Sequence, residues 1–245
     1  MSDLAMTIAP GAWPGVDEPV VLRPSGMLVL PARATGFVAD LHLGKTAHFQ
    51  RAGVAVPHGA DAATLARLDQ DLQSHKLQHL VVLGDLVHSR QALTPELHDK
   101  LQGLRERCPA LQLHLVWGNH DRHAREALQP LLATLGWHSC PREGWCDGPV
   151  RGLHDPEDFT PDPNTRLTLL GHLHPGVRIK GRARQQLRLP CFAAGPLGTN
   201  AGTAANQGTR VLLPAYGRFT GQSPQLPEDC PWVYAIAGEA VLALG

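Results

Sequence analysis

Side chains that carry oxygen or imidazole groups recur along this sequence in short motifs. The motifs are DLH at residues 40–42, GD at 84–85, GNHD at 118–121, a histidine that follows an apolar run, and GHLH at 171–174. The candidate ligands in these motifs are Asp40, His42, Asp85, Asn119, His154, His172 and His174. Side chains two apart on an extended segment face the same way, so DLH and the HLH of GHLH can each present a pair.

This set of donors suits transition metals. Carboxylate and imidazole ligands with an amide oxygen, and no thiolate, fit Mn, Fe or Zn rather than Mg or Cu(I). One ion rarely takes so many protein ligands, whereas two ions that share a bridging carboxylate can. Two ions about 3.5 to 4 Å apart can hold the attacking and leaving oxygens of an in-line displacement at phosphorus. The motifs therefore indicate a two-metal site suited to that chemistry.

Each of these residues, taken alone, also has an ordinary structural interpretation. An Asp or Asn at a strand end is commonly a turn former or a helix cap. The joint occurrence of such groups after successive apolar runs favours the metal site. His138 is the alternative to His154, because residues 152–154 form the least distinctive of the motifs.

The motifs need elements that bring them together. Apolar runs at residues 35–40, 79–85 and 111–119 predict strands, and helical spacing at 61–75, 95–107 and 124–135 predicts a helix after each strand. Alternation of this kind predicts βαβ units and a sheet covered on both faces. Ligands of such sheets bind at the carboxyl ends of the strands, which is where these motifs lie.

From about Val150 onward the pattern changes to short strand-like runs with little helix between them. The runs are residues 150–154, 166–172, 177–181, 186–192, 210–214, 232–238 and 240–245. Gly, Pro and Asn turns separate them, which predicts a strand-rich sheet packed against the first half. We expect residues 1–245 to form a single domain, with roughly the first 25 residues as a flexible or edge segment.

Composition excludes few classes of protein. The chain is 43% hydrophobic and 18% charged, and Lys+Arg and Asp+Glu balance at 22 each, which gives no argument for nucleic acid from net charge. The cysteines contain no C-x-x-C pair, which favours free thiols over a disulfide or zinc-ribbon framework. Residues 1–15 have neither a basic start nor an apolar h-region, and no window holds a membrane-spanning apolar run, so we expect a cytoplasmic protein.

The order D-x-H, G-D, G-N-H-D, H and G-H-x-H resembles that of the calcineurin-like metallophosphoesterase family. The resemblance implies an α/β fold of four layers, α-β-β-α, with two facing mixed sheets. Its implied ligands for one divalent metal are Asp40, His42 and His174, and for a second metal Asn119, His154 and His172, with Asp85 as the bridge. A hydroxide between the metals would attack phosphorus, His120 would protonate the leaving oxygen, and Asp121 would orient the His120 imidazole.

A closer resemblance links residues 37–221 to the ligase-associated, PdeM-type phosphodiesterases of bacteria. It rests on ADLHLGKTAHFQRAG, GDLVHS, WGNHDR, LPCF and LLPAYGRFTG. It implies an Mn-dependent phosphodiesterase and single-strand DNA endonuclease of DNA repair, associated with a DNA ligase and a helicase. The alternatives are a phosphodiesterase or phosphatase that acts on a small nucleotide, and a non-catalytic scaffold of the same fold, which the full set of ligands disfavours.

Three further side chains are candidates for contact with a substrate. Lys45 could reach a phosphate, His88 could line the same cleft, and Arg122 could contact a nucleic-acid backbone, although each could equally be an ordinary surface residue. Residues 177–188 hold five basic residues and no acidic one. If extended, this segment would present Arg178, Lys180, Arg182 and Arg184 on one face, whereas Gly181 favours a hairpin tip with solvated basic residues.

Overall fold

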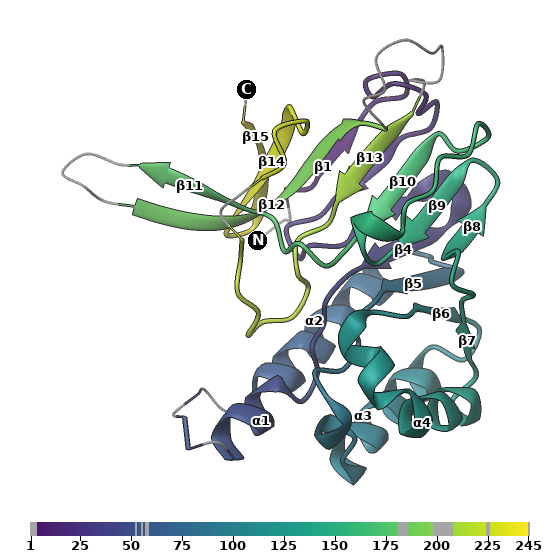
Figure 1. The fold of residues 1–245 in the computed structure, drawn as a ribbon, viewed down its shortest axis with the longest axis vertical. Helices are drawn as coiled ribbons and strands as arrows, with labels where there is room; N and C mark the ends of the chain where they lie inside the picture. The colour runs from purple at the N-terminus through teal and green to yellow at the C-terminus, as the bar shows by residue number, and fades with distance from the viewer. Residues whose placement is uncertain are drawn as a thin grey trace.

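The structure is a computed structural model that describes residues 4–51, 53–54, 56, 59–180, 186–197, 208–223 and 226–244. Two β-sheets lie face to face, and the α-helices gather below one of them (Figure 1). The first half of the chain builds the helix-covered sheet, and most of the second half builds the other.

The first sheet changes from antiparallel to parallel at its fourth strand. In spatial order its strands are β1 (Met6–Ile8), β2 (Val20–Leu22), β3 (Leu28–Leu30), β4 (Thr35–Val38), β5 (His79–Leu83), β6 (Gln112–Val116) and β7 (Trp137–Ser139). Strands β1 to β4 pair antiparallel, and β4 to β7 pair parallel. The carboxyl ends of β4, β5 and β6 therefore meet at one edge of the sheet.

Four α-helices lie on the outer side of this sheet within the described part of the chain. They are α1 (Lys45–Arg51), α2 (Ala60–Ser74), α3 (Pro95–Arg107) and α4 (Asn119–Thr134). Helix α3 begins after the N-cap Thr94, and its Leu97, Leu101 and Leu104 are buried at helical spacing. These leucines join a core that also includes Val82 of β5.

The second sheet is mixed and carries a projecting hairpin. In spatial order its strands are β15 (Ala240–Leu244), β14 (Trp232–Ala237), β12 (Gln186–Pro196), β13 (Thr209–Leu212), β10 (Leu167–Leu170), β9 (Val150–Leu153) and β8 (Trp145–Asp147). Strands β9, β10 and β13 run parallel to one another, and the remaining pairs are antiparallel. Short 3-10 turns lie at Pro31–Arg33, Arg90–Ala92 and Pro156–Asp158.

The main core lies between the two sheets. Phe37 on β4 and Leu83 on β5 pack there against residues such as Phe192 on β12. The next residue along β4, Val38, instead belongs to the core under the helices. Both faces of the parallel strands are thus buried, which explains why their sequences are continuous apolar runs.

The α/β class and the two facing mixed sheets are confirmed. All of the described α-helices precede β7, and α2, α3 and α4 cover the first sheet. The outer face of the second sheet is covered in the described residues by loop side chains, which include Phe159 and Leu226. The fourth layer, expected to be helical, is therefore made of loops there.

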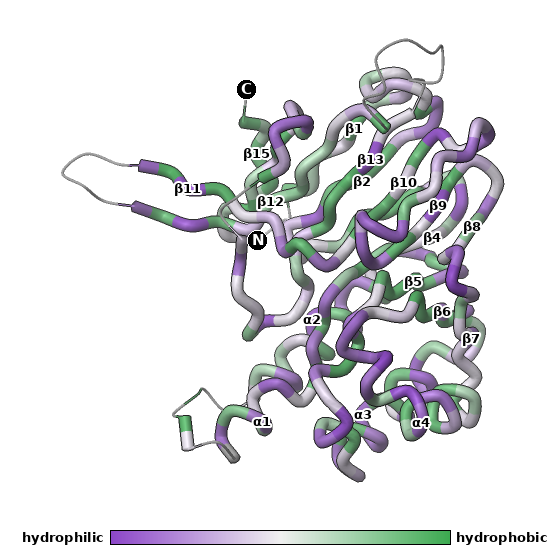
Figure 2. The backbone as a smooth tube through the Cα atoms, in the orientation of Figure 1, coloured by the Kyte–Doolittle hydropathy of each residue, from purple (hydrophilic) through white to green (hydrophobic). Residues whose placement is uncertain are grey.

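Strand β11 (Gly176–Lys180) pairs with β12 alone, and the two strands extend well beyond the body of the molecule (Figure 1). Hydrophilic and hydrophobic residues alternate along this hairpin (Figure 2). Arg178 and Lys180 share one of its faces, as an extended segment requires, while Arg182 and Arg184 lie outside the described residues.

The five cysteines are free thiols, and three of them are buried. Among the described residues, no helix is long and apolar enough to cross a membrane.

Candidate metal centre

The candidate ligands follow parallel strands of both sheets. Asp40 and His42 follow β4, Asp85 follows β5, His154 follows β9, and the HLH segment at 172–174 follows β10. Residues 119–121 lie in the first turn of α4, which begins five residues earlier than the sequence predicts. The two sheets thus bring their carboxyl ends together, although these motifs are far apart in the sequence.

One group of side chains surrounds the space between Asp40, His42 and His174. The Nε2 atoms of His42 and His174 lie 3.4 Å apart. His174 Nε2 lies 3.3 Å from Asp40 Oδ1, and His42 Nε2 lies 3.6 Å from Asp85 Oδ2. Ligand atoms of Asp40, His42 and His174 fall within 4.8 Å of one another, a spacing that could hold one metal ion.

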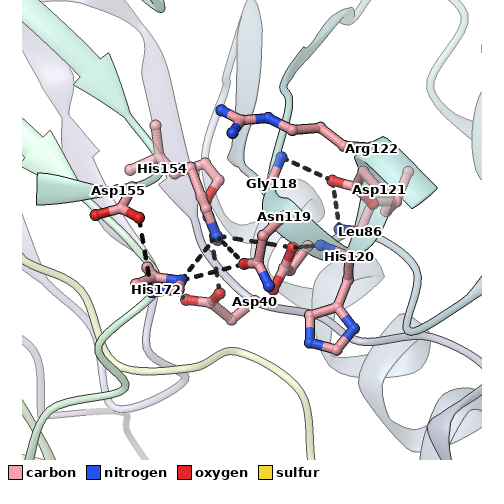
Figure 3. Close-up of polar contacts among 12 residues, drawn as sticks. Asp40, Leu86, Gly118, Asn119, His120, Asp121, Arg122, His154, Asp155 and His172 are labelled. Carbon is pink, nitrogen blue, oxygen red and sulfur yellow. Dashed lines mark hydrogen bonds and ion pairs between the residues drawn. The ribbon is translucent and has the colours of Figure 1, made fainter. Parts of the chain in front are cut away.

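A second group lies beside the first, and Figure 3 shows its members converging on the Asn119 amide. The Oδ1 atom of Asn119 lies 2.9 Å from His154 Nε2 and 3.2 Å from His172 Nδ1. The other oxygen of Asp85, Oδ1, lies 3.7 Å from His154 Nε2. Because Asp85 presents one oxygen to each group, it occupies the position of a bridging carboxylate.

The backbone is strained at these residues. In the part of the chain that the structure describes, only six non-glycine residues have a positive φ, and one of them is Ala34. The other five, with φ between 45° and 69°, are Asp40, His42, Asp85, His172 and His174. Each such residue costs on the order of 1–3 kcal/mol, and strain of this kind collects at functional sites. The strain therefore marks the same place as the motifs, on independent grounds.

Two glycines allow the segments to approach closely. A Cβ atom on Gly84 would lie 2.2 Å from His154 Nδ1, and one on Gly118 would lie 2.1 Å from Asp85 Oδ1. Both distances are far inside van der Waals contact. The glycines of the GD and GNHD motifs are therefore required for packing the candidate ligands against one another.

The donors fit divalent cations. His154 Nδ1 lies 2.9 Å from the Leu83 carbonyl and donates to it, which leaves Nε2 with a lone pair that faces the Asn119 oxygen. Two lone pairs directed at each other repel, and a cation bound by both would remove that repulsion. Asp40 Oδ1 and His42 Nδ1 are buried without a hydrogen-bond partner in the described residues, which is costly unless another group satisfies them.

Burial controls protonation at the centre. Loss of solvation raises the pKa of Asp85 to about 8, and the nearby Asp40 and Asp121 carboxylates act in the same direction. Burial, with His174 next to it, lowers the pKa of His42 to about 2. His42 is therefore a neutral imidazole with a lone pair to offer, and a divalent cation would hold Asp85 ionised at neutral pH.

Comparisons with known proteins agree with this geometry. Residues 35–152 match the family of calcineurin-like phosphoesterases. A crystal structure of the nuclease MPE of Pseudomonas putida is similar with a TM-score of 0.73 and 31% sequence identity, over 98% of this chain and 100% of that chain. The chain belongs to the calcineurin-like phosphoesterase family. As a calcineurin-like phosphoesterase, the protein is a metal-dependent enzyme of a family that uses a dinuclear metal centre. The comparison with curated proteins gives no match.

His120 lies at the edge of the centre of this calcineurin-like phosphoesterase. Its Nδ1 lies 2.7 Å from the carbonyl of His88, and the two imidazole rings stack with centroids 4.8 Å apart. Donation from Nδ1 to that carbonyl leaves Nε2 as the nitrogen available for proton transfer. The His42 ring lies 4.8 Å from the His120 ring, so the imidazole stands beside the first group of candidate ligands.

The expected contact between Asp121 and the His120 imidazole is wrong. Asp121 is fully buried and accepts hydrogen bonds from the backbone N–H groups of Leu86, Val87 and Gly118, at 3.0 to 3.2 Å. Neighbouring residues of a helix do not face each other, and both residues lie in the first turn of α4. Asp121 instead joins the loop after β5 to the start of the helix.

The side chains predicted to contact the substrate, and the alternative ligand His138, lie at different distances from the metal centre. His88 is half-buried next to His120 and His42, and burial lowers its pKa to about 4. Lys45 is the first residue of α1; burial lowers its pKa, and the Asp85 and Asp40 carboxylates act against that change. His138 lies on β7 with Nε2 2.9 Å from the Gln112 side chain, so the structure brings His154, and not His138, to the centre.

Asp155 and Asp158 lie near the centre but were not predicted from the sequence. Asp155 Oδ2 lies 3.7 Å from His172 Nε2, where a carboxylate can orient a ligand imidazole. The adjacent pair His154-Asp155 could have indicated it. Arg122 Nη2 lies 3.1 Å from Asp158 Oδ2, and Figure 3 shows its side chain extending past Gly118 on the side away from His120. No sequence motif indicates Asp158.

Proposed function

We propose that this calcineurin-like phosphoesterase is an Mn-dependent phosphodiesterase and a single-strand DNA endonuclease. The observation that carries the proposal is the bridging position of Asp85, with one oxygen 3.6 Å from His42 and the other 3.7 Å from His154. Imidazole, carboxylate and amide donors without thiolate suit Mn, with Fe or Zn as alternatives. The left-handed backbone in both groups of candidate ligands costs free energy, and bound cations would offset that cost.

The residues divide the work as follows. Asp40, His42 and His174 would hold one cation, and Asn119, His154 and His172 would hold the other, with an oxygen of Asp85 offered to each. When bound, two divalent cations activate water and neutralise charge on the phosphoryl oxygens. His120 protonates the departing oxygen from Nε2, and the His88 carbonyl holds the ring in place through Nδ1. Lys45 and His88 contact the scissile phosphodiester, Arg122 contacts the nucleic-acid backbone beyond it, and Asp121 fixes the turn that carries His120.

Two observations support a nucleic-acid substrate. The similar structure from Pseudomonas putida is that of a nuclease. The hairpin β11–β12 begins two residues after His174, and Arg178 on β11 stands directly opposite Arg188 on β12. Like charges directly opposite each other destabilise a strand pair, and a bound phosphate chain would relieve that repulsion.

A role in DNA repair, beside a DNA ligase and a helicase, is proposed from the motif resemblance alone. The alternative is a phosphodiesterase or phosphatase of small nucleotides, which the same centre would serve. No candidate ligand is missing, which argues against a non-catalytic scaffold.

Activity of the metal-stripped chain, measured with and without added Mn, tests the proposal. The substrates are bis-p-nitrophenyl phosphate, p-nitrophenyl phosphate and circular single-stranded DNA. We expect Mn-dependent hydrolysis of the diester and linearisation of the circle, with little attack on the monoester. Activity on the monoester alone would refute the nuclease, and activity on the diester alone would favour the small-nucleotide alternative.

A further inference from the structure

A cavity of about 360 Å³ adjoins the metal centre on the side of His154. Its walls come from the end of β6, the first turns of α4, the loop between β7 and β8, the end of β9, and the 3-10 turn Pro156–Asp158. His154 belongs both to this cavity and to the second group of candidate ligands. A group bound in the cavity would therefore lie next to a phosphate held at the centre.

Positive charge dominates the polar lining. The cavity is lined by Arg122, Arg125 and Arg142, against the single carboxylate of Asp158. Arg122 and Arg125 stand three residues apart on α4, a spacing that places both on the same side of the helix. Within the described residues, Arg142 forms no ion pair or hydrogen bond through its side chain. The cavity thus holds more cationic groups than its own carboxylate can neutralise.

The hydrogen-bonding groups of the lining are mostly donors. The guanidinium of Arg125 lies 4.8 Å from the centroid of the Trp117 ring, which holds it in place by a cation–π contact. Trp117 is itself buried and lines the cavity. An occupant that offers several acceptor oxygens and negative charge would satisfy this lining.

Packing alone does not account for this arrangement. The Arg125 stack on Trp117 could be structural, and the ion pair of Arg122 with Asp158 is half-exposed and worth little in stability. Neither role explains why a third arginine from a separate loop faces the same cavity. Arginine is the side chain best suited to phosphate, because its planar fork can donate two parallel hydrogen bonds.

We propose that this cavity binds the phosphate of the nucleotide next to the scissile phosphodiester, through Arg122, Arg125 and Arg142. The inference rests on the proposed phosphodiesterase function and names a second anchor for its substrate. A diester with one phosphate fills the metal centre alone, whereas a strand fills both. The cavity therefore favours nucleotide chains over small diesters.

Dinucleotides with and without a second phosphate provide the test. The Mn-loaded chain is given d(TpT), d(pTpT) and d(TpTp), with bis-p-nitrophenyl phosphate as the single-phosphate reference. We expect one of the two terminal phosphates to raise kcat/KM at least about tenfold over d(TpT), because hydrogen bonds to charged groups are strong. Arg122→Ala and Arg142→Ala should each reduce that advantage to about threefold or less, and hydrolysis of the reference diester should be nearly unchanged in Arg142→Ala.

Arg107→Ala is the matched control. Arg107 is 49% exposed in its side chain and pairs with Asp69 on the helical side of the molecule, as Arg122, also 49% exposed, pairs with Asp158. The control should keep the full advantage of the second phosphate. The proposal would be overturned if neither terminal phosphate raised kcat/KM in the wild type. It would also be overturned if the advantage survived in both cavity variants.

Binding supplies a readout that does not need turnover. Calorimetry with the Mn-loaded chain should show that thymidine 3′,5′-bisphosphate binds more tightly than thymidine 5′-monophosphate in the wild type and in Arg107→Ala. The difference should disappear in Arg142→Ala. Inactivity on bis-p-nitrophenyl phosphate would count against the proposed phosphodiesterase, whereas equal affinities for the two nucleotides would count against the cavity alone.

Discussion

At the scale of single residues, the loss of His120 should slow the reaction by an amount that depends on the leaving group of the substrate. The Nδ1 of His120 is held by the His88 carbonyl at 2.7 Å, so His120→Ala removes the proton donor and leaves all seven candidate ligands in the chain. We expect DNA cleavage to fall by about 10²- to 10⁴-fold. Hydrolysis of bis-p-nitrophenyl phosphate should fall less, because p-nitrophenolate leaves without protonation. Kinetics on both substrates and metal content measure this, with the exposed His123→Ala on the same helix as control.

Wild-type rates of DNA cleavage in His120→Ala would contradict the assigned role. Loss of bound metal in that variant would show that His120 acts through the cations instead.

Asp121 is expected to act on stability more than on proton transfer. Asp121→Ala leaves three backbone donors of Leu86, Val87 and Gly118 without their acceptor in a buried place. The expected loss is about 3 to 5 kcal/mol in the free energy of unfolding, or about 10 °C in Tm. Thermal unfolding measures it, and Asp99→Ala, which removes an exposed carboxylate on α3, should cost less than about 1 kcal/mol. Equal Tm values for the two variants would contradict this account.

At the scale of elements, the long apolar runs predicted strands and helices well. Helix α3 has the predicted bounds, because Thr94 and Pro95 provide a clear start. The strands β1, β2, β3, β7 and β8 were not predicted, since each has three residues and too little sequence to show alternation. The start of α4 was misplaced because polar residues of the GNHD motif fill its first turn, where no apolar period is visible.

Three histidines stack across neighbouring strands of the first sheet. His114 Nε2 on β6 lies 3.3 Å from His79 Nδ1 on β5, and its ring lies 5.3 Å from that of His138 on β7. Burial first, and then these neighbours, lower the pKa of His114 from 6.5 to about 4. Below pH 6.5 His114 is protonated in the unfolded chain but stays neutral in the folded chain. The free energy of unfolding therefore falls as the pH drops toward 4.

His114→Gln should reduce this acid sensitivity. Between pH 7 and pH 5 we expect the variant to lose less stability than the wild type, by on the order of 1 kcal/mol once solvent screening of a half-exposed group is allowed for. Denaturant unfolding at several pH values measures the difference, and the exposed His98→Gln should behave as the wild type. Parallel stability curves for wild type and His114→Gln would show that His114 does not contribute.

At the scale of the whole molecule, the order of motifs predicted that distant segments meet, but not the path that brings them together. The short polar residues after β4, β5 and β10 are visible in the sequence as DLH, GD and GHLH. Their left-handed backbone is not visible, because only a few per cent of non-glycine residues adopt it, although Asp and His do so more often than most, and no local pattern requires it. The sequence of residues 177–188 allowed two interpretations. The basic run favoured an extended segment with its charges on one face, and Gly181 favoured the tip of a hairpin.

The hairpin provides a test of the substrate at this scale. Replacing Arg178 and Arg188 with serine removes two charges from one face, and should lower the salt dependence of single-stranded DNA binding by about 1.4 in log–log slope. Hydrolysis of bis-p-nitrophenyl phosphate should not change. The matched control replaces Lys100 and Arg107 on α3, and binding is measured by fluorescence anisotropy at several salt concentrations. An unchanged slope in the hairpin variant would exclude this surface as a contact.

The central claim is that two cations share Asp85. Anomalous diffraction from crystals of the Mn-loaded protein tests it most directly. We expect two Mn peaks about 3.5 to 4 Å apart, one beside Asp40, His42 and His174 and the other beside Asn119, His154 and His172, with an Asp85 oxygen on each. A single peak, or two peaks that Asp85 does not join, would contradict the account.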